Sequence, residues 1–308
     1  MPINLDSCIT GIFVPGNIGA SAGQVPVAPT VPSFSVGNYG VGTARGVGSA
    51  LGDTFRRAAG SAAGTGAAAA VGAVVASPPL DAYTTGLTGA WSMHRQLLTS
   101  YGGAFNANTG GLVGTINDQS GGSRNFTAAG VSRPALSTLG SLTSATFNST
   151  GWPSMTISSA LSNFITASAG YWVWVGSIDA LPASFCRLFH NLTSETVGLL
   201  ILSTNIASAY TDDGGNKQAT TALGGTGKHV ITWRHESGTL YVSVDGGTEA
   251  SIAAGNTSAV TGNMELSNSS TGNNAFDGKF VELYVWSTVP SSGSRTAIIA
   301  QAKTLLGI

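Results

Sequence analysis

The sequence predicts an all-β protein, a sandwich of antiparallel sheets with an extended N-terminal arm and a short C-terminal helix. From about residue 86 onward, short segments of alternating apolar and polar residues follow one another between Gly-rich turns. This spacing is typical of antiparallel sandwiches rather than of parallel α/β folds. Residues 1–85 lack the alternation and are rich in Gly, Ala and Pro. We therefore expect two regions, an arm over residues 1–85 and a sandwich over residues 86–308.

The arm has no pattern that would form a core of its own. Its recurrent Gly and Pro residues exclude long helices and wide sheets, and it offers too little apolar surface to offset chain entropy. We therefore expect a neighbouring protein in an assembly to hold the arm in place. The Ala-rich segment 58–76 favours a helix. Because that segment lacks Leu, Ile and Phe, we expect no membrane span there.

The clearest strand in the first half of the sandwich region is Tyr171–Asp179. Its side chains alternate, with Tyr171, Val173 and Val175 on one face and Trp172 and Trp174 on the other. Upstream of it, residues 91–101 fit either a short helix or a strand, and we favour the helix. The sequence therefore predicts a helix near the start of the sandwich and strands after it.

The second half of the sandwich region contains a predicted strand pair and a terminal strand followed by a helix. Lys228–His235 and Thr239–Asp245 are predicted to pair, with a turn at Asp245-Gly246-Gly247. Phe280–Trp286 is predicted to place Val281, Leu283 and Val285 toward the core. The segment Ser291–Leu306 has a Ser at its start, an apolar stripe and a closing Gly307, which together indicate a helix.

A set of motifs in this order resembles a known family. Asp118-Gln119-Ser120-Gly121 is followed by Arg133-Pro134, then by the strand and turn at residues 240–247, and then by the terminal strand and helix. The order resembles the laminin-G-like, concanavalin A-like jelly roll found in phage virion and bacterial surface proteins. The resemblance covers residues 86–308 and implies a lectin-like sandwich. Residues 1–85 match no family that we can name.

Composition and charge exclude several classes of partner. Only 9% of the residues are charged and the net charge is −1, with no cluster of Lys and Arg. Nucleic acids and anionic membranes are bound through such clusters, so we expect neither partner. The two cysteines, Cys8 and Cys186, either remain free and buried or pair if the arm folds back onto the sandwich. Neither lies at the spacing of a zinc site.

Glu282, Tyr284 and Trp286 form the first candidate ligand-binding group. They share one face of the predicted terminal strand, opposite the aliphatic face. A carboxylate beside aromatic rings is a common sugar-binding arrangement, because rings stack on C–H faces while the acid accepts hydrogen bonds from hydroxyls. The alternative is that the rings pack under a loop and that Glu282 pairs with an arginine. Both interpretations remain open at this point.

Two further candidates depend on exposure and on turn geometry. Trp172 and Trp174 would be a binding surface if the face that they share is exposed, and core packing is the alternative. Asp118 is a candidate calcium ligand, because hard cations prefer oxygen ligands and laminin-G-like domains often hold calcium at the sandwich rim. The alternative for Asp118 is a hydrogen bond within its own turn. We expect no cofactor other than this calcium ion.

The carboxylates do not predict catalysis. Retaining glycosidases need two carboxyl groups about 5–5.5 Å apart, and Glu265 and Glu282 each lack an acidic neighbour two residues away. We therefore expect that the protein is not an enzyme.

Together these observations predict a virion structural protein of a tailed phage, such as a capsid decoration, a fibre or a tail appendage. The arm would bind other virion proteins, the jelly roll would face cell-surface glycans, and the protein would form a homo-oligomer, with a trimer favoured. The first alternative is a free bacterial carbohydrate-binding module or adhesin. The second, which we favour less, is a glycoside hydrolase.

Overall fold

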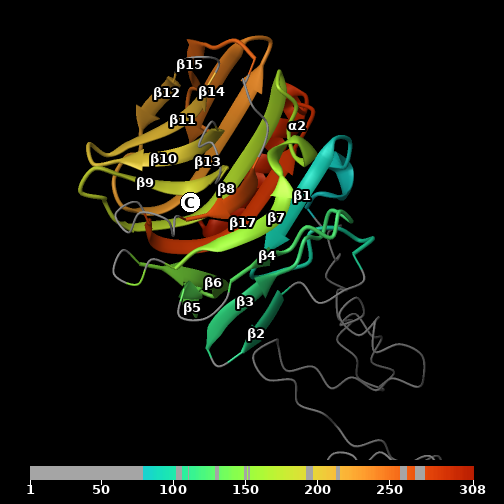
Figure 1. Ribbon diagram of the computed structural model, residues 1–308, viewed down its shortest axis with the longest axis vertical. Coiled ribbons are helices and arrows are strands. Elements are labelled where there is room, and N and C mark those ends of the chain that lie inside the picture. Colours follow the sequence, from blue (N-terminus) through green and yellow to red (C-terminus); the bar gives the residue numbers. More distant parts are fainter. Residues whose placement is uncertain are drawn as a thin grey trace, which may run out of the picture. The chain divides into compact units, whose positions relative to one another are not determined.

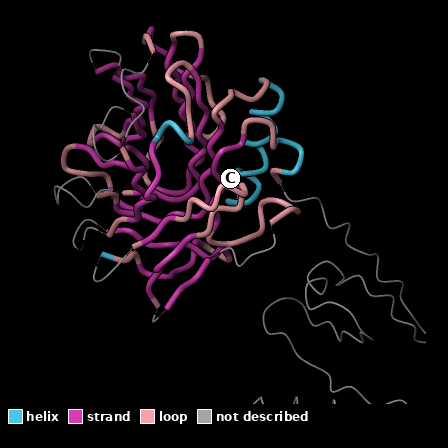
Figure 2. The backbone as a smooth tube through the Cα atoms, turned by 45° about the vertical axis from the view of Figure 1, so that its right-hand side comes forward, coloured by secondary structure: helices cyan, strands magenta, loops and turns pink. Residues whose placement is uncertain are grey.

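The structure is a computed structural model that describes residues 79–101, 106–109, 111–128, 132–148, 151, 153–191, 197–212, 216–256, 262–267 and 275–308. The predicted arm up to residue 78 lies outside these residues, as do its Ala-rich segment 58–76 and Cys8. Strands make up most of the described chain (Figure 2). In the described residues, no helix has the length and hydropathy needed to cross a membrane.

In the part of the chain that the structure describes, seventeen strands are joined by hydrogen bonds into one antiparallel sheet that folds into two halves. We call the first half the open sheet. In order of neighbouring strands it consists of β12 (Asn216–Ala222), β11 (Ile206–Asp212), β10 (Val197–Leu202), β9 (Phe185–Asn191), β16 (Asn263–Leu266), β7 (Met155–Ala160), β4 (Phe126–Thr127), β3 (Leu112–Ile116) and β2 (Asn106–Thr109). The strands β9 to β12 follow one another side by side in Figure 1.

The second half is here called the covered sheet. In order of neighbouring strands it contains β15 (Ala250–Ala253), β14 (Thr239–Val244), β13 (Gly227–Glu236), β8 (Ala169–Ala180) and β17 (Asp277–Trp286). On its other edge β17 pairs with two strands, β1 (Leu87–Ser92) and β6 (Leu142–Phe147). The strand β6 pairs in turn with β5 (Ala135–Leu139). A single pairing between Leu112 of β3 and Ala135 of β5 joins the two halves. The short 3-10 helices are η1 (Asp81–Tyr83) and η3 (Leu161–Asn163).

Two apolar clusters hold these layers together. The larger one lies between the sheets and includes Trp172, Trp174 and Trp233 from the covered sheet with Phe189 and Leu199 from the open sheet. The smaller cluster covers the outer face of the covered sheet. There the helix α2 (Ser292–Leu306) and residues 80–101 pack on strands β8, β13 and β17. The described part of the chain is thus an all-β antiparallel sandwich with one C-terminal α-helix, which confirms the predicted fold class.

The helix α2 has the caps that its sequence predicted. The Ser291 side chain accepts a hydrogen bond from the Ser294 N–H, and Gly307 ends the helix at φ 71°, in the left-handed region that glycine adopts without strain. Ile298, Ala302 and Leu306 are the buried side chains of this helix. Local capping and an apolar stripe therefore suffice to specify this element.

Two local predictions are wrong. Residues 91–101 form no helix, because Trp91 and Ser92 belong to β1 and the following segment is irregular. In β17 the register shifts between Phe280 and Glu282, so Val281 joins the outer cluster while Leu283 and Val285 face the space between the sheets. A bulge of this kind turns one side chain to the other face of the strand.

The thiol of Cys186 lies inside the sandwich core and is free. Burial raises the pKa of this thiol to about 12, and the thiolate is the form that reacts. We expect a Cys8→Ser variant to show no rapid reaction with a thiol reagent at about pH 8, and one equivalent of reaction once denaturant unfolds it. Rapid labelling of the native variant would contradict this placement of Cys186.

Candidate functional site

The outer face of the open sheet presents a row of polar side chains at one register position. Glu265 of β16 pairs with His190 of β9, His190 with Gly198 of β10, Gly198 with Tyr210 of β11, and Tyr210 with Gln218 of β12. Paired residues in antiparallel strands point to the same face. The adjacent residues Leu199 and Ala209 point the other way, into the core. The row therefore lies on the face that is turned away from the covered sheet.

Part of this face is hollowed. A hollow of about 210 Å³ lies over strands β9 to β12 and is lined by Phe185, Arg187, Leu200, Leu202, Tyr210, Asn216 and Gln218. Two of these residues are aromatic, two carry side-chain amides, and Arg187 is the one charged residue among the described lining residues. We call this feature the β9–β12 hollow.

The Tyr210 ring can lie over β10 because its partner on that strand, Gly198, has no side chain. A Cβ added at Gly198 would lie 2.4 Å from the Cε1 atom of Tyr210, closer than any tolerated contact. The ring therefore lies over the backbone of β10, at one wall of the hollow. The Trp233 indole N–H donates to the Tyr210 carbonyl at 3.2 Å and fixes the strand beneath the ring.

Arg187 of β9 also lines the hollow and is stacked on a ring. Its guanidinium carbon lies 5.3 Å from the centre of the Phe185 ring, and the residue is 7% exposed. Arginine stacks on aromatic faces through cation–π attraction, which fixes the plane of its donors. The hollow thus combines rings for stacking, amides for hydrogen bonding and one oriented positive charge.

Beside the hollow, the polar row continues as a fully buried pair. The His190 Nε2 atom lies 3.2 Å from a carboxylate oxygen of Glu265 and 3.1 Å from the Ser267 carbonyl, and both residues of the pair are 0% exposed. This pairing could not be predicted from the sequence, because 75 residues separate the two side chains along the chain.

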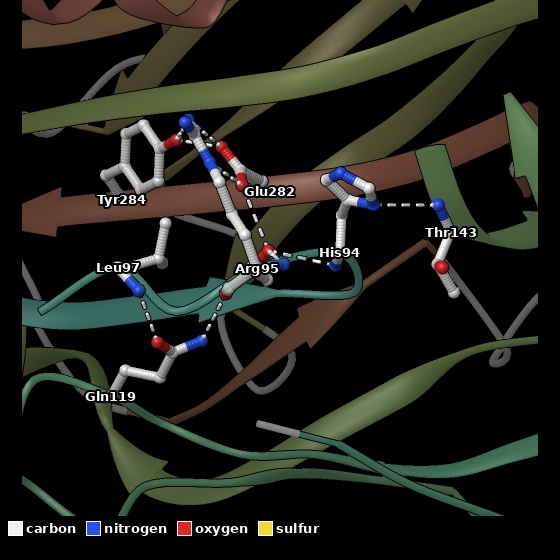
Figure 3. A network of polar contacts seen from close by, with 8 residues as sticks. His94, Arg95, Leu97, Gln119, Thr143, Glu282 and Tyr284 are labelled. Atoms are coloured by element: carbon white, nitrogen blue, oxygen red, sulfur yellow. Dashed lines mark hydrogen bonds and ion pairs between the residues drawn. The ribbon is translucent and has the colours of Figure 1, made fainter. Parts of the chain in front are cut away.

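The predicted group Glu282, Tyr284 and Trp286 lies on the other sheet, inside the outer cluster. Glu282 is fully buried and accepts hydrogen bonds from Ser92 Oγ at 2.9 Å, from Arg95 Nε at 2.8 Å and from Arg95 Nη2 at 3.0 Å, as well as from the Tyr284 hydroxyl (Figure 3). The Trp286 indole N–H donates to the Tyr83 carbonyl at 2.8 Å. The alternative interpretation, an acid paired with an arginine under a packed segment, therefore describes these contacts.

Two groups in this region, Tyr284 and His94, have shifted pKa values. Burial raises the pKa of Tyr284 well above its usual range, and the neighbouring Glu282 carboxylate adds to the shift. Burial also lowers the pKa of His94, whose Nδ1 accepts a hydrogen bond from the Thr143 N–H at 3.2 Å (Figure 3). A ligand would have to displace Arg95 to reach Glu282, so the ligand-binding role of this group stays a prediction.

The other predicted tryptophans are not exposed. Trp172 and Trp174 are both 0% exposed and lie between the sheets, where Trp172 stacks on Trp233 with ring centres 4.4 Å apart. The prediction of a binding surface required the face that these residues share to be exposed. Because both side chains are buried, this condition is not met. Alternation placed the two residues on one face correctly, but both faces of β8 are covered, one by the open sheet and one by α2.

Asp118 binds its own turn and the neighbouring strand. Its carboxylate accepts hydrogen bonds from the N–H groups of Ser120 at 2.9 Å, of Ala90 at 3.2 Å and of Arg124 at 3.2 Å. In the same motif, Gln119 accepts from the Leu97 N–H at 2.6 Å and donates to the Arg95 carbonyl (Figure 3). The motif therefore fastens residues 90–97 to the sandwich.

A calcium ion at Asp118 would compete with these three N–H groups for the carboxylate, and the calcium role stays a prediction. Among the residues that the structure describes, no group of three or more His, Cys, Asp or Glu side chains is arranged to hold a metal.

Comparison with known proteins gives a likeness in fold. No protein-family model and no curated protein matches the chain. Among solved structures, a GH54 α-L-arabinofuranosidase is similar at a TM-score of 0.54 and 14% identity, over 73% of this chain and 64% of that one. The binding domain of Paraclostridial Mosquitocidal Protein 1 is similar at a TM-score of 0.50 and 10% identity, over 72% of this chain and 52% of that one.

A third likeness is to Trypanosoma rangeli sialidase in complex with the inhibitor DANA, at a TM-score of 0.49 and 11% identity. The match covers 68% of this chain and 32% of the sialidase, so this chain spans about a third of the length of the sialidase. At these identities the likenesses show the all-β fold alone. The finer resemblance to laminin-G-like domains of phage and bacterial surface proteins finds no support in them and stays a prediction.

The prediction that the chain is not an enzyme does not stand, because the likeness to the arabinofuranosidase shows that this fold occurs in a glycoside hydrolase. The arabinofuranosidase, a glycoside hydrolase, shares the fold over most of the chain. The prediction depended on the absence of acids two residues apart. Residues that lie far apart in the chain, such as His190 and Glu265, meet through strand pairing, so spacing in the sequence cannot exclude catalysis.

Proposed function

We propose that the protein binds a carbohydrate in the β9–β12 hollow. The observation that carries this proposal is the composition of the lining: Tyr210 and Phe185 supply rings, and Asn216 and Gln218 supply planar hydrogen-bonding groups around one hollow. Sugars are recognised by this combination, because their C–H faces stack on rings while their hydroxyls bond to planar polar groups.

The size of the hollow limits the ligand. Pockets that enclose a drug-sized ligand measure about 300–1,000 Å³, and the β9–β12 hollow is smaller, at about 210 Å³. It fits one sugar ring, with the rest of a glycan lying outside. Contact with a single ring predicts weak binding per site, which favours a ligand displayed in many copies on a surface.

The test is glycan binding by the full chain, measured on an array and by calorimetry. Asn216 and Gln218 are exposed, so replacing both with alanine should leave the fold unchanged and reduce binding at least about tenfold, the effect of losing two hydrogen bonds. Thr220→Ala is the matched control, because Thr220 is exposed on the same strand and face but does not line the hollow.

Binding that survives the double replacement would contradict the proposed location. Release of reducing sugar from the bound glycans, assayed in the same samples, distinguishes a glycoside hydrolase from a carbohydrate-binding module or adhesin.

We also propose, from the sequence of residues 1–85, that the arm attaches the sandwich to a phage particle as an oligomeric decoration, fibre or tail appendage. The support is compositional: a Gly-, Ala- and Pro-rich stretch has too little apolar surface to fold alone. Deleting residues 1–80 should abolish incorporation into particles in an assembly assay. Incorporation of the shortened chain at the level of the full chain would contradict the proposal.

A further inference from the structure

We infer that the sugar bound in the β9–β12 hollow carries an acetamido group, whose methyl packs on an apolar patch and whose amide bonds to Gln218. This inference rests on the proposed carbohydrate binding and names the class of sugar. It starts from the distribution of the lining: three apolar side chains lie over β9 and β10, while two side-chain amides lie over β12. An apolar part and a polar part therefore adjoin in one hollow.

The apolar patch consists of Phe185, Leu200 and Leu202, and strand pairing brings these residues side by side. Phe185 of β9 pairs with Leu202 of β10, and paired residues point to the same face. Leu200 lies two residues before Leu202 on that face, whereas Ile201 between them points into the core. The three side chains thus form one continuous apolar surface in the hollow.

The patch disfavours a sugar hydroxyl and favours a methyl group. A hydroxyl placed over it would lose water without gaining a protein partner, which costs free energy. The charged lining residue Arg187 does not change this, because its Nε and Nη1 atoms are shielded from solvent and its guanidinium lies over the Phe185 ring. A methyl group meets the patch without that cost and buries apolar surface. A plain hexose, with hydroxyls around its whole rim, therefore fits less well than a sugar with a methyl substituent.

Gln218 brings an amide to the edge of this patch. Its Oε1 atom accepts a hydrogen bond from the Ser208 hydroxyl at 3.5 Å, and Ser208 is the strand partner of Leu200. The Gln218 head group therefore reaches across β11 toward the patch. A contact of this length is weak, and Ser208 is the one side-chain partner of Gln218 among the residues that the structure describes. The exposed amide is thus available to a ligand.

An acetamido group has both features that these neighbours require. Its methyl is one bond away from the amide carbon, so contact with the patch and a hydrogen bond to Gln218 can form together. The Gln218 amide carries donors and an acceptor, and it can donate to the C=O or accept from the N–H of an acetamide. A 6-deoxy sugar supplies a methyl without an amide, and a plain hexose supplies neither. The juxtaposition therefore favours an acetamido sugar over both.

The experiment compares methyl N-acetylglucosaminide with methyl glucoside, two ligands that differ at C2 alone, by NMR titration of the full chain. We expect the acetamido ligand to bind about tenfold more tightly, the combined effect of one buried methyl group and one hydrogen bond. Leu202→Ala shortens the patch and Gln218→Ala removes the amide, so each should lower the preference to about threefold. The controls Ile252→Ala, a partly exposed apolar residue outside the hollow, and Thr220→Ala, on the strand of Gln218, should retain it.

The two variants guard against a folding effect, because Gln218 is exposed and its replacement tests the site even if Leu202→Ala does not fold. A preference that survives in every folded variant would overturn the assignment to these residues. Equal affinity for the two glycosides would overturn the inference and leave carbohydrate binding in place. Tighter binding of methyl 6-deoxyglucoside than of the acetamido ligand would overturn the acetamido class. No binding of any glycoside or glycan would overturn the proposed function itself.

Discussion

Replacing Arg95 with alanine is expected to lower the free energy of unfolding by about 3–5 kcal/mol. The replacement leaves the carboxylate of Glu282, 0% exposed, without the partner that neutralises it. The desolvation cost of that charge then falls on the folded state alone. Urea denaturation followed by tryptophan fluorescence measures the change, since the described core contains five tryptophans, at positions 91, 172, 174, 233 and 286.

The matched control for this prediction is Arg295→Ala. The Arg295 side chain donates one hydrogen bond, from Nη1 to the Pro290 carbonyl at 2.9 Å, and makes no ion pair with a buried acid among the described residues. Its loss should cost no more than about 1.5 kcal/mol. If the two variants lose equal stability, the Arg95–Glu282 pair is not the stabilising element that its geometry indicates.

Replacing Trp172 with alanine is expected to destabilise the sandwich by about 3–5 kcal/mol, because it removes one of the largest buried side chains. The indole stacks on Trp233 and meets Phe189 edge-on at 4.9 Å, so its loss opens a cavity between the sheets. The measurement is the urea midpoint together with glycan binding below that midpoint.

This variant also distinguishes the two roles considered for Trp172. Leu181→Ala, which alters a partly exposed apolar residue at 38% exposure, should change stability little and serves as the control. A stable Trp172→Ala variant that has lost glycan binding would restore the binding role and contradict the core placement.

The sequence predicted those elements of the fold that local signals determine. Alternation identified β8 and the faces of its residues, turn residues identified the pairing of β13 with β14, and Ser291 and Gly307 bounded the closing helix. The failures occurred where tertiary contacts override local pattern. Residues 93–98 take their shape from hydrogen bonds to Gln119 and from the burial of Leu97 and Leu98 in the outer cluster. No local periodicity in the sequence reports these contacts.

The candidate site could not be predicted in the same way. The β9–β12 hollow combines residues from four strands, and their register decides which side chains meet. Gly198 opposite Tyr210 is informative only once β10 and β11 are paired. By contrast, Glu282, Tyr284 and Trp286 are neighbours on one strand, which made them visible in the sequence. Their burial depended on the segment 80–97, whose position the sequence did not reveal.

The pairing of β1 with β17 has a consequence for biosynthesis. Leu87 lies opposite Trp286, and Ser92 lies opposite Glu282, so the earliest strand of the sandwich finds its hydrogen-bonding neighbour almost two hundred residues later. A ribosome must release residue 286 before β1 can pair, and such distant contacts form slowly. During translation the nascent chain therefore carries an unpaired strand edge, and cellular yield should depend on chaperones that shield it until synthesis is complete.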